Sequence, residues 1–134
     1  MGGEAFYVPS RDYIQIPRPD AFPDPINWHR TAFHELGHWT GHPSRLSRDQ
    51  SGRFGSPEYG REELCAEMTS AFVCAALGIE PSVRHADYLG SWLAILREDN
   101  RAIVRAASAA SKAADFLLAF GRGEEEAPEF ARAA

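Results

Sequence analysis

Long hydrophobic runs and cysteines are scarce in this sequence of 134 residues. No apolar stretch approaches the roughly 20 residues that a membrane-spanning helix requires, and the first residues lack the basic and apolar regions of a secretory signal. We therefore expect a cytoplasmic protein without membrane contact. The two cysteines, Cys65 and Cys74, fall nine residues apart within one expected helix, which is too far for a disulfide, so we expect buried free thiols.

Positive charge is also sparse. Thirteen Arg and one Lys stand against nineteen Asp and Glu, which gives a formal net charge of -5. This balance is a poor basis for nucleic-acid binding. The one local basic cluster, Arg45, Arg48 and Arg53, could touch phosphates or a partner protein, but the Ser-, Arg- and Gly-rich stretch around it favours a solvated loop.

Length and hydrophobic content indicate one domain over residues 1–134, in which we expect residues 1–5 and 122–134 to be flexible. The expected fold is α+β and mainly helical, with a small antiparallel hairpin at the N-terminus and no internal repeat. The expected elements are strands at 6–8 and 13–16, a helix at 28–41 capped by Asn27, a loop at 44–56, a helix from Ser56 and Pro57 to a stop at Gly78, a helix at 85–98, and a helix from a cap at Asp99 or Asn100 to Gly121.

Apolar residues at helical spacing predict which side of each later helix packs in the core. The predicted core residues are Leu64, Met68, Ala71, Phe72 and Ala75 in the second helix, Tyr88, Leu89, Trp92, Leu93 and Leu96 in the third, and Ile103, Val104, Ala107, Ala114, Leu117 and Leu118 in the fourth. We interpret these residues, the aromatic ones included, as core packing rather than as a ligand site.

The pentapeptide His34-Glu35-Leu36-Gly37-His38 carries the clearest chemical signal. On a helix, His34 and His38 lie one turn apart on nearly the same face, where two imidazoles can bind one Zn²⁺ ion. A zinc held by three protein ligands keeps a fourth position for water and lowers the pKa of that water to about 7. Glu35 lies beside the imidazoles and is placed to accept the proton of this water as general base. The pattern predicts a zinc-dependent metallopeptidase, which is a hydrolase.

A third ligand is expected from the carboxylates of the next predicted helix, Glu62, Glu63 and Glu67. Glu63 and Glu67 share a helical face, and Glu63-Leu64-Cys65-Ala66-Glu67 resembles the E-x-x-x-D/E pattern of gluzincin-type metallopeptidases. The resemblance implies that Glu63 binds the metal and that Glu67 orients a ligand His by hydrogen bonding. Glu62 points about 100° away on the helix and is the alternative ligand.

Simpler alternatives stay open. The spacing of the pentapeptide can arise by accident, and the carboxylates can form the solvated face of an amphipathic helix. The metzincin pattern H-E-x-x-H-x-x-G-x-x-H is followed through Gly41 and then broken, because Ser44 stands where its third His belongs. His29, His42 and His85 are further ligand candidates, although a lone His is more often structural or solvated.

A longer set of residues carries a family resemblance. The set comprises Phe6-Tyr7-Val8-Pro9-Ser10-Arg11-Asp12, His34-Glu35-Leu36-Gly37-His38-Trp39-Thr40-Gly41-His42-Pro43-Ser44-Arg45-Leu46, Arg61-Glu62-Glu63-Leu64, Ala66-Glu67, Gly90-Ser91-Trp92-Leu93 and Ala114-Asp115-Phe116-Leu117-Leu118-Ala119-Phe120. It resembles the C-terminal metallopeptidase domain of ArdC-type antirestriction proteins, also found in TraC-like primases and other polyvalent proteins of plasmids and phages. The resemblance implies a zincin-like fold, a zinc site and a role in shielding incoming mobile DNA from host restriction. Full-length members carry an N-terminal single-stranded-DNA-binding domain that this sequence lacks, so direct nucleic-acid binding is not expected here.

The sequence supports two functional hypotheses. In the first, the chain hydrolyses a protein or peptide substrate, with Glu35 as base, and the resemblance implies a host restriction or defence protein as the target. In the second, it is a non-proteolytic, zinc-containing module that inhibits such a protein or binds DNA. We also expect the strand at Tyr13 to Ile16 to edge the cleft and to pair with an extended peptide.

Overall fold

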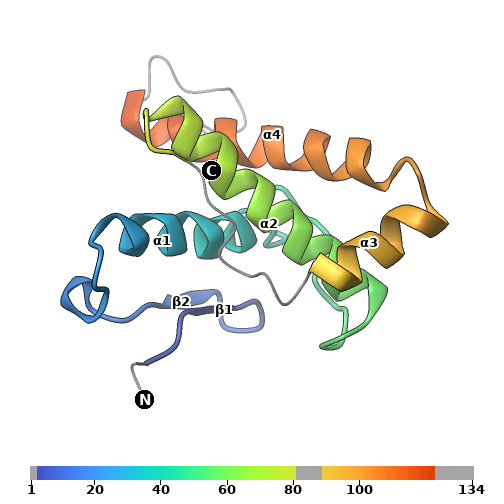
Figure 1. The fold of residues 1–134 in the computed structure, drawn as a ribbon, viewed down its shortest axis with the longest axis horizontal. Helices are drawn as coiled ribbons and strands as arrows, with labels where there is room; N and C mark the ends of the chain where they lie inside the picture. Colours follow the sequence, from blue (N-terminus) through green and yellow to red (C-terminus); the bar gives the residue numbers. More distant parts are fainter. Residues whose placement is uncertain (1–2, 81–88, 123–134) are drawn as a thin grey trace.

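The computed structural model describes residues 3–80 and 89–122. In chain order, the elements are β1 (Phe6–Val8), β2 (Tyr13–Gln15), the short 3-10 helix η1 (Pro19–Ala21), α1 (Ile26–Trp39), α2 (Pro57–Ala76), α3 (Leu89–Glu98) and α4 (Ala102–Arg122). The two strands form an antiparallel hairpin next to α1, and α2 packs against both α1 and α4 (Figure 1). The prediction of a mainly helical α+β fold with an N-terminal hairpin is therefore confirmed.

The hairpin forms where predicted, apart from its last residue. Its turn closes through the Asp12 N–H, which donates to Val8 O at 2.7 Å. Asp12 has a φ of +54°, in the left-handed region that Asp tolerates better than most residues. β2 ends at Gln15 rather than at Ile16, because the following Pro17 has no N–H with which to extend the ladder.

Helix α1 begins and ends two residues earlier than predicted. Asn27 is therefore not its N-cap: Asn27 lies in the first turn, where its Oδ1 accepts a hydrogen bond from Arg30 Nη1 at 2.9 Å. The residue before the helix is Pro25, and the Asp24 carboxylate accepts the Ile26 N–H at 3.3 Å. The proline-rich segment thus already turns into the helix before Asn27.

Helix α2 starts as predicted, because Ser56 Oγ accepts the Tyr59 N–H at 3.1 Å, but its buried side differs from the predicted stripe. Phe72 is 37% exposed and Ala75 is also exposed. The buried apolar and small polar residues are Cys65, Ala66, Thr69, Ser70, Val73 and Cys74. Since α2 lies against α1 and α4 at once, small side chains on two faces are buried instead of one broad apolar stripe.

Helices α3 and α4 also bury a different set from the predicted one. Leu93, Ile103 and Val104 are 54%, 49% and 66% exposed. Trp92 and Ala114 are buried as predicted, and the other buried residues of these helices are Ile95, Ala102, Ala110, Ala113, Phe116 and Ala119. An alanine-rich face lets α4 lie close to α2. The face that permits this close approach is buried, although larger apolar side chains lie on the other faces.

The boundaries of these two helices are close to the prediction. The predicted beginning of the third helix, residues 85–88, lies outside the described residues. The Asp99 carboxylate accepts the Arg101 N–H at 3.0 Å, as a residue at a helix start does, and α4 begins at Ala102. It ends at Arg122, one residue past the predicted Gly121.

The cysteines agree with the sequence analysis. Cys65 and Cys74 are buried and unpaired, as predicted. Burial raises the pKa of the Cys65 thiol to about 11, which keeps it protonated at neutral pH. None of the helices within residues 3–80 and 89–122 is both long and apolar enough to cross a membrane.

Candidate metal centre

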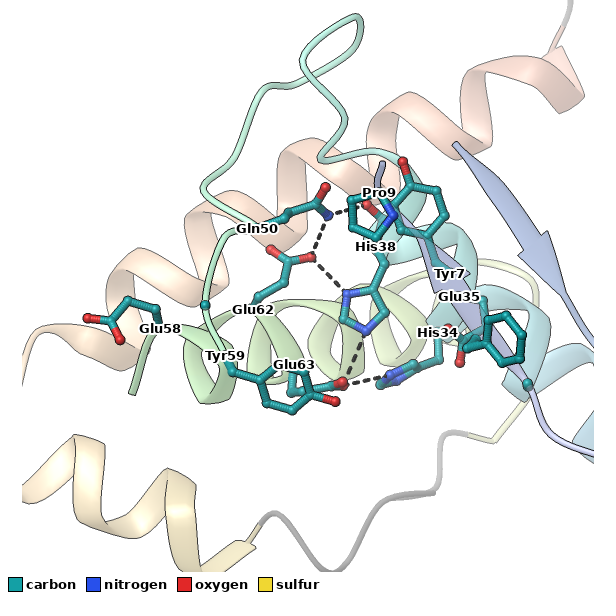
Figure 2. Close-up of a pocket in the computed structure, with 13 residues that line it drawn as sticks. Tyr7, Pro9, His34, Glu35, His38, Gln50, Glu58, Tyr59, Glu62 and Glu63 are labelled. Carbon is teal, nitrogen blue, oxygen red and sulfur yellow. Dashed lines mark hydrogen bonds and ion pairs between the residues drawn. The ribbon is translucent and has the colours of Figure 1, made fainter. Parts of the chain in front are cut away.

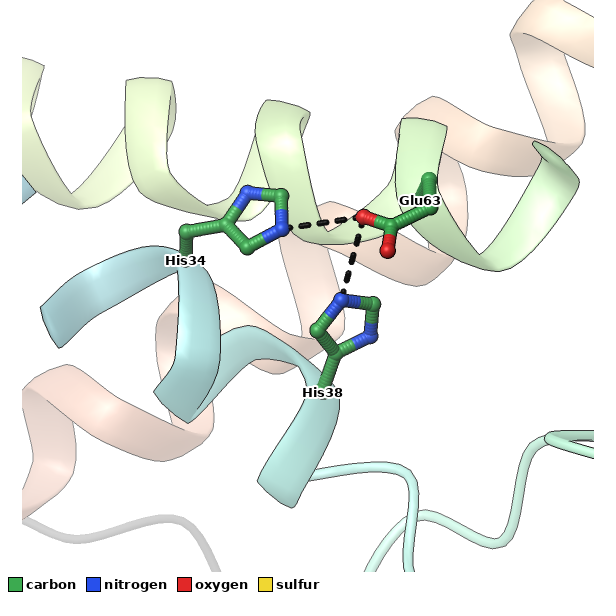
Figure 3. Close-up of side chains that lie close together, drawn as sticks. All are labelled: His34, His38 and Glu63. Carbon is green, nitrogen blue, oxygen red and sulfur yellow. Dashed lines mark hydrogen bonds and ion pairs between the residues drawn. The ribbon is translucent and has the colours of Figure 1, made fainter. Parts of the chain in front are cut away.

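Two helices bring three donor side chains together. α1 carries His34 and His38 one turn apart, and α2 places Glu63 opposite them (Figure 3). Glu63 Oε2 lies 3.0 Å from His34 Nε2 and 3.2 Å from His38 Nε2. One donor atom from each residue lies within 4.8 Å of the other two, so a single metal ion could reach all three.

Each imidazole is held on its other side by a further carboxylate of α2. His34 Nδ1 donates to Glu67 Oε2 at 2.9 Å, and His38 Nδ1 donates to Glu62 Oε2 at 2.9 Å. Glu62, the alternative ligand of the sequence analysis, is thus directed at His38 Nδ1 and not at the Nε2 atoms. Because α2 runs antiparallel to α1, the later His meets the earlier carboxylate, and both Nε2 atoms remain directed at Glu63.

The electrostatics of the cluster favour positive charge at its centre. Burial lowers the pKa of both imidazoles, but hydrogen bonds to the carboxylates outweigh it, raising the pKa of His34 and bringing that of His38 to about 10. Burial raises the pKa of Glu62 and of Glu63, but hydrogen bonds to their cationic partners lower both below the ordinary value. Carboxylates thus concentrate negative charge where a divalent cation would be bound.

The cluster lines an open cavity of about 370 Å³ (Figure 2). Glu35, only 4% exposed, lines the cavity from α1 together with the two imidazoles. The remaining walls are Gln50, Gly52, Glu58, Tyr59 and Glu62 on one side and Ala5, Phe6, Tyr7 and Pro9 on the other. The prediction that the strand at 13–16 edges this cleft is wrong, because the hairpin presents its first strand, β1, to the cavity.

Gly37, which lies between His34 and His38 in the sequence, lets α1 and α2 approach each other closely. A Cβ atom at this position would lie 3.1 Å from Ala66 Cα and 3.2 Å from Thr69 Cβ. Glycine is unfavourable inside a helix by roughly 1 kcal/mol relative to alanine. Its presence here is explained by the close approach that brings Glu63 within reach of the imidazoles.

The loop between α1 and α2, residues 40–56, closes the C-terminal end of α1. Three of its side chains donate to the last carbonyl oxygens of the helix: Arg48 Nη2 to Gly37 O at 2.6 Å, Gln50 Nε2 to His38 O at 2.5 Å, and Arg45 Nε to Trp39 O at 2.7 Å. At the end of a helix, the last carbonyls lack the N–H groups that a further turn would supply. Positively charged side chains at this end also complement the helix dipole. The loop therefore fixes the end of the helix that carries the imidazoles.

The expectation of a solvated basic loop is wrong for two of its three arginines. The Arg45 guanidinium stacks 3.8 Å from the centroid of the Trp39 ring and pairs with Asp12 of the hairpin. Arg48 forms an ion pair with Glu62 at 2.9 Å. Arg53 is exposed, as expected. The packing partners of the loop, rather than its composition, determine this difference.

Of the remaining His candidates, His29 and His42 do not join the cluster. His42 Nδ1 lies 2.8 Å from Ser44 Oγ within the loop, and His29 is exposed beside the Trp28 ring. His85 lies outside the described residues. Sequence reasoning missed the contributions of Arg48 and Gln50, which follow no helical or strand period and carry no recognisable motif.

Comparison with known proteins identifies the family of this chain. A family model described as "Zincin-like metallopeptidase" matches residues 1–109. The chain belongs to this zincin-like family. The Mn(II)-bound crystal structure of the antirestriction protein ArdC from plasmid R388 is similar to this zincin-like domain, with a TM-score of 0.77 and 41% identity, over 84% of this chain and 43% of that chain. The metal-free ArdC structure gives a TM-score of 0.72 and 43% identity over 84% and 41% of the two chains. The predicted resemblance is therefore confirmed.

Curated relatives are longer proteins. A DNA primase TraC of Escherichia coli is 52% identical over 118 residues, which cover 87% of this chain and 11% of that protein. A second DNA primase TraC of E. coli is 48% identical over 121 residues, or 89% and 8%. The uncharacterized protein y4eC of Sinorhizobium fredii is 45% identical over 120 residues, or 88% and 39%. The zincin-like domain thus corresponds to less than half the length of each.

Proposed function

We propose that this zincin-like domain is a zinc-dependent metallopeptidase that hydrolyses peptide bonds in a protein substrate. The proposal rests on one observation, the convergence of His34 Nε2, His38 Nε2 and a Glu63 carboxylate oxygen within 4.8 Å, in a cavity that Glu35 also lines. Two imidazoles and a carboxylate are the protein ligands of a class of catalytic zinc sites that keep one position open. A similar ArdC crystal structure is Mn(II)-bound, which supports the binding of a divalent metal by this domain.

The residues of this chain divide the chemistry among them. A bound zinc supplies a Lewis acid and lowers the pKa of its water to about 7. Glu35, buried beside the ligands, accepts the proton of the attacking water and later delivers a proton to the leaving amine. Glu67 accepts a hydrogen bond from His34 Nδ1 and so keeps Nε2 of that ring directed toward Glu63, where it would bind the ion.

We further propose that the substrate is a host restriction or defence protein, met in the cytoplasm. The similarity to ArdC, which is described as an antirestriction protein of a plasmid, supports this choice. The matches to TraC primases place related domains in other DNA-handling proteins. The cavity is lined by carboxylates and contains no Lys or Arg among its described walls, so direct nucleic-acid binding at this site is not proposed.

Replacing Glu35 tests the proteolytic step. Glu35→Gln keeps the size of the side chain and removes the base, so we expect hydrolysis to fall by about 10²- to 10⁴-fold while the bound metal is retained. Purified wild type and variant would be incubated with a restriction-competent cell extract, and new protein N-termini would be counted by mass spectrometry. Glu58→Gln, a change of an exposed carboxylate at the cavity wall, serves as the matched control.

The same variant separates the two functional hypotheses. Antirestriction in cells should fall together with cleavage if proteolysis is the mechanism. If Glu35→Gln cells keep full antirestriction, the non-proteolytic binding module is the correct description and the peptidase proposal is wrong.

Metal binding is expected to release protons. In the metal-free protein the pKa of His38 is about 10, so this imidazole is protonated near neutral pH and must lose a proton before Nε2 can bind a metal. Because protons compete with the ion, the apparent metal affinity should rise with pH up to about that value. Calorimetric titrations in two buffers of different ionisation enthalpy would measure the release of at least one proton per ion. Identical heats in both buffers would contradict the assignment of His38.

A further inference from the structure

A network of hydrogen bonds and ion pairs connects the loop at 40–56 to His38. Glu62 Oε2 accepts from His38 Nδ1 at 2.9 Å and from Gln50 Nε2 at 3.0 Å (Figure 2). Arg48 binds the same carboxylate through both of its oxygens, with Nε 2.9 Å from Oε1 and Nη2 3.0 Å from Oε2. The side chains of Glu62, Arg48 and His38 are only 10%, 14% and 12% exposed. Water therefore has little access to compete for the hydrogen bonds of this network.

The guanidinium of Arg48 is itself fixed by α1 and its end. Nη1 donates to Thr40 Oγ1 at 2.9 Å, and Nη2 donates to Gly37 O at 2.6 Å. Gly41 makes room for this arrangement, because a Cβ atom there would lie 2.8 Å from Arg48 Nη2 and 2.5 Å from Gln50 Nε2. Helix α1 and its C-terminal end therefore hold Arg48 in one orientation. Helix α1 also carries His38, to which Arg48 is linked through Glu62.

We infer that Arg48 and Glu62 are a positioning pair for His38 in the metal site. A carboxylate that accepts hydrogen bonds from a planar guanidinium at both oxygens is fixed in orientation. Glu62 Oε2 then fixes the tautomer and the ring plane of His38. Without Arg48, Glu62 would be a partly buried carboxylate next to Glu63 with less positive charge to offset the repulsion. His34 is paired with a different carboxylate, Glu67.

This inference rests on the metal site of the proposed function, but it is tested by metal affinity rather than by hydrolysis. Arg45 provides a matched control, because it also caps a carbonyl of α1 from the same loop but contacts Asp12 and Trp39 instead of Glu62. The variants would be Arg48→Ala, Glu62→Ala, their double mutant and Arg45→Ala. Zn²⁺ affinity would be measured by competition with a chromophoric chelator, the ligand field by the visible spectrum of the Co²⁺-loaded protein, and folding by thermal unfolding.

We expect Arg48→Ala and Glu62→Ala each to weaken Zn²⁺ binding by about 10- to 100-fold and to alter the Co²⁺ spectrum. Arg45→Ala should lower the unfolding temperature without either change. Because Arg48 acts through Glu62, the double mutant should bind Zn²⁺ no more weakly than Glu62→Ala alone.

Two outcomes would overturn the inference. If wild type binds Zn²⁺ and Arg48→Ala or Glu62→Ala binds it no differently from Arg45→Ala, the positioning pair is wrong while the proposed function stands. If wild type binds no Zn²⁺, the proposed function and the positioning pair fall together.

Discussion

Glu63→Ala is expected to purify almost free of metal. Glu63 Oε2 is the atom that approaches Nε2 of both imidazoles, and without it only His34 and His38 of the three donors remain. We expect the metal affinity to fall by more than about 100-fold, beyond the loss typical for a residue that only orients a ligand. Elemental analysis of wild type and variant, purified side by side, would measure this, with about one zinc per chain in the wild type.

Two further variants make the Glu63 result specific. Glu63→Gln keeps the volume of the side chain and removes its charge, so it should also lose most of the metal while folding normally by circular dichroism. Glu58→Ala removes an exposed carboxylate from the same helix and the same cavity and should keep the metal. Wild-type metal content in Glu63→Ala would show that the third ligand is another residue.

Gly37→Ala is expected to destabilise the domain and to weaken metal binding together. The added Cβ would lie 3.1 Å from Ala66 Cα and 3.3 Å from Ala66 O, and backbone atoms cannot move aside as a flexible side chain can. Overpacking of this kind costs about 1–3 kcal/mol, which exceeds the gain of about 1 kcal/mol from placing alanine in a helix. Relief requires α1 to move away from α2, which separates Glu63 from the imidazoles.

Thermal unfolding and metal affinity of the Gly37 variant would be measured together. A net loss near 1 kcal/mol corresponds to a fall in Tm of about 3–6 °C in a domain of this size. Gly121→Ala is the matched control, since this glycine of α4 has no atom within 4 Å of the position of its added Cβ. A Gly37 variant as stable as the Gly121 variant would mean that the two helices can separate without consequence.

The clustering of the candidate metal ligands was predictable from the sequence to the extent that these residues obey helical periodicity. His34 and His38 repeat at one turn on α1, and Glu63 and Glu67 repeat at one turn on α2, so each pair shares a face whatever the tertiary structure. The direction of Glu62 was not predictable in this way. It depends on the antiparallel placement of α2 along α1, which periodicity within one helix does not specify.

The same limit applies to the fold. The existence of the hairpin and of α1, α2, α3 and α4 followed from local signals such as Ser56 before α2 and Asp99 before α4, whereas the short helix η1 was not predicted. The inward face of α2 did not, because contact with α1 and α4 selects small residues such as Ala66 and Thr69 in place of Phe72. Hydrophobicity predicts burial poorly where helices approach closely enough to exclude large side chains.

The donor atoms of the described cluster are nitrogen and oxygen, and the nearby thiol of Cys65 is buried with its pKa raised to about 11. No thiolate therefore competes for the ion, and peroxide has no sulfur ligand to attack. Affinity among first-row divalent ions at such a site follows the general order that rises from Mn²⁺ to Cu²⁺, with little selection by ligand softness. Loading with zinc would then depend on the metal supply of the cell, and occupancy would persist under the oxidative stress that empties cysteine-bound zinc sites.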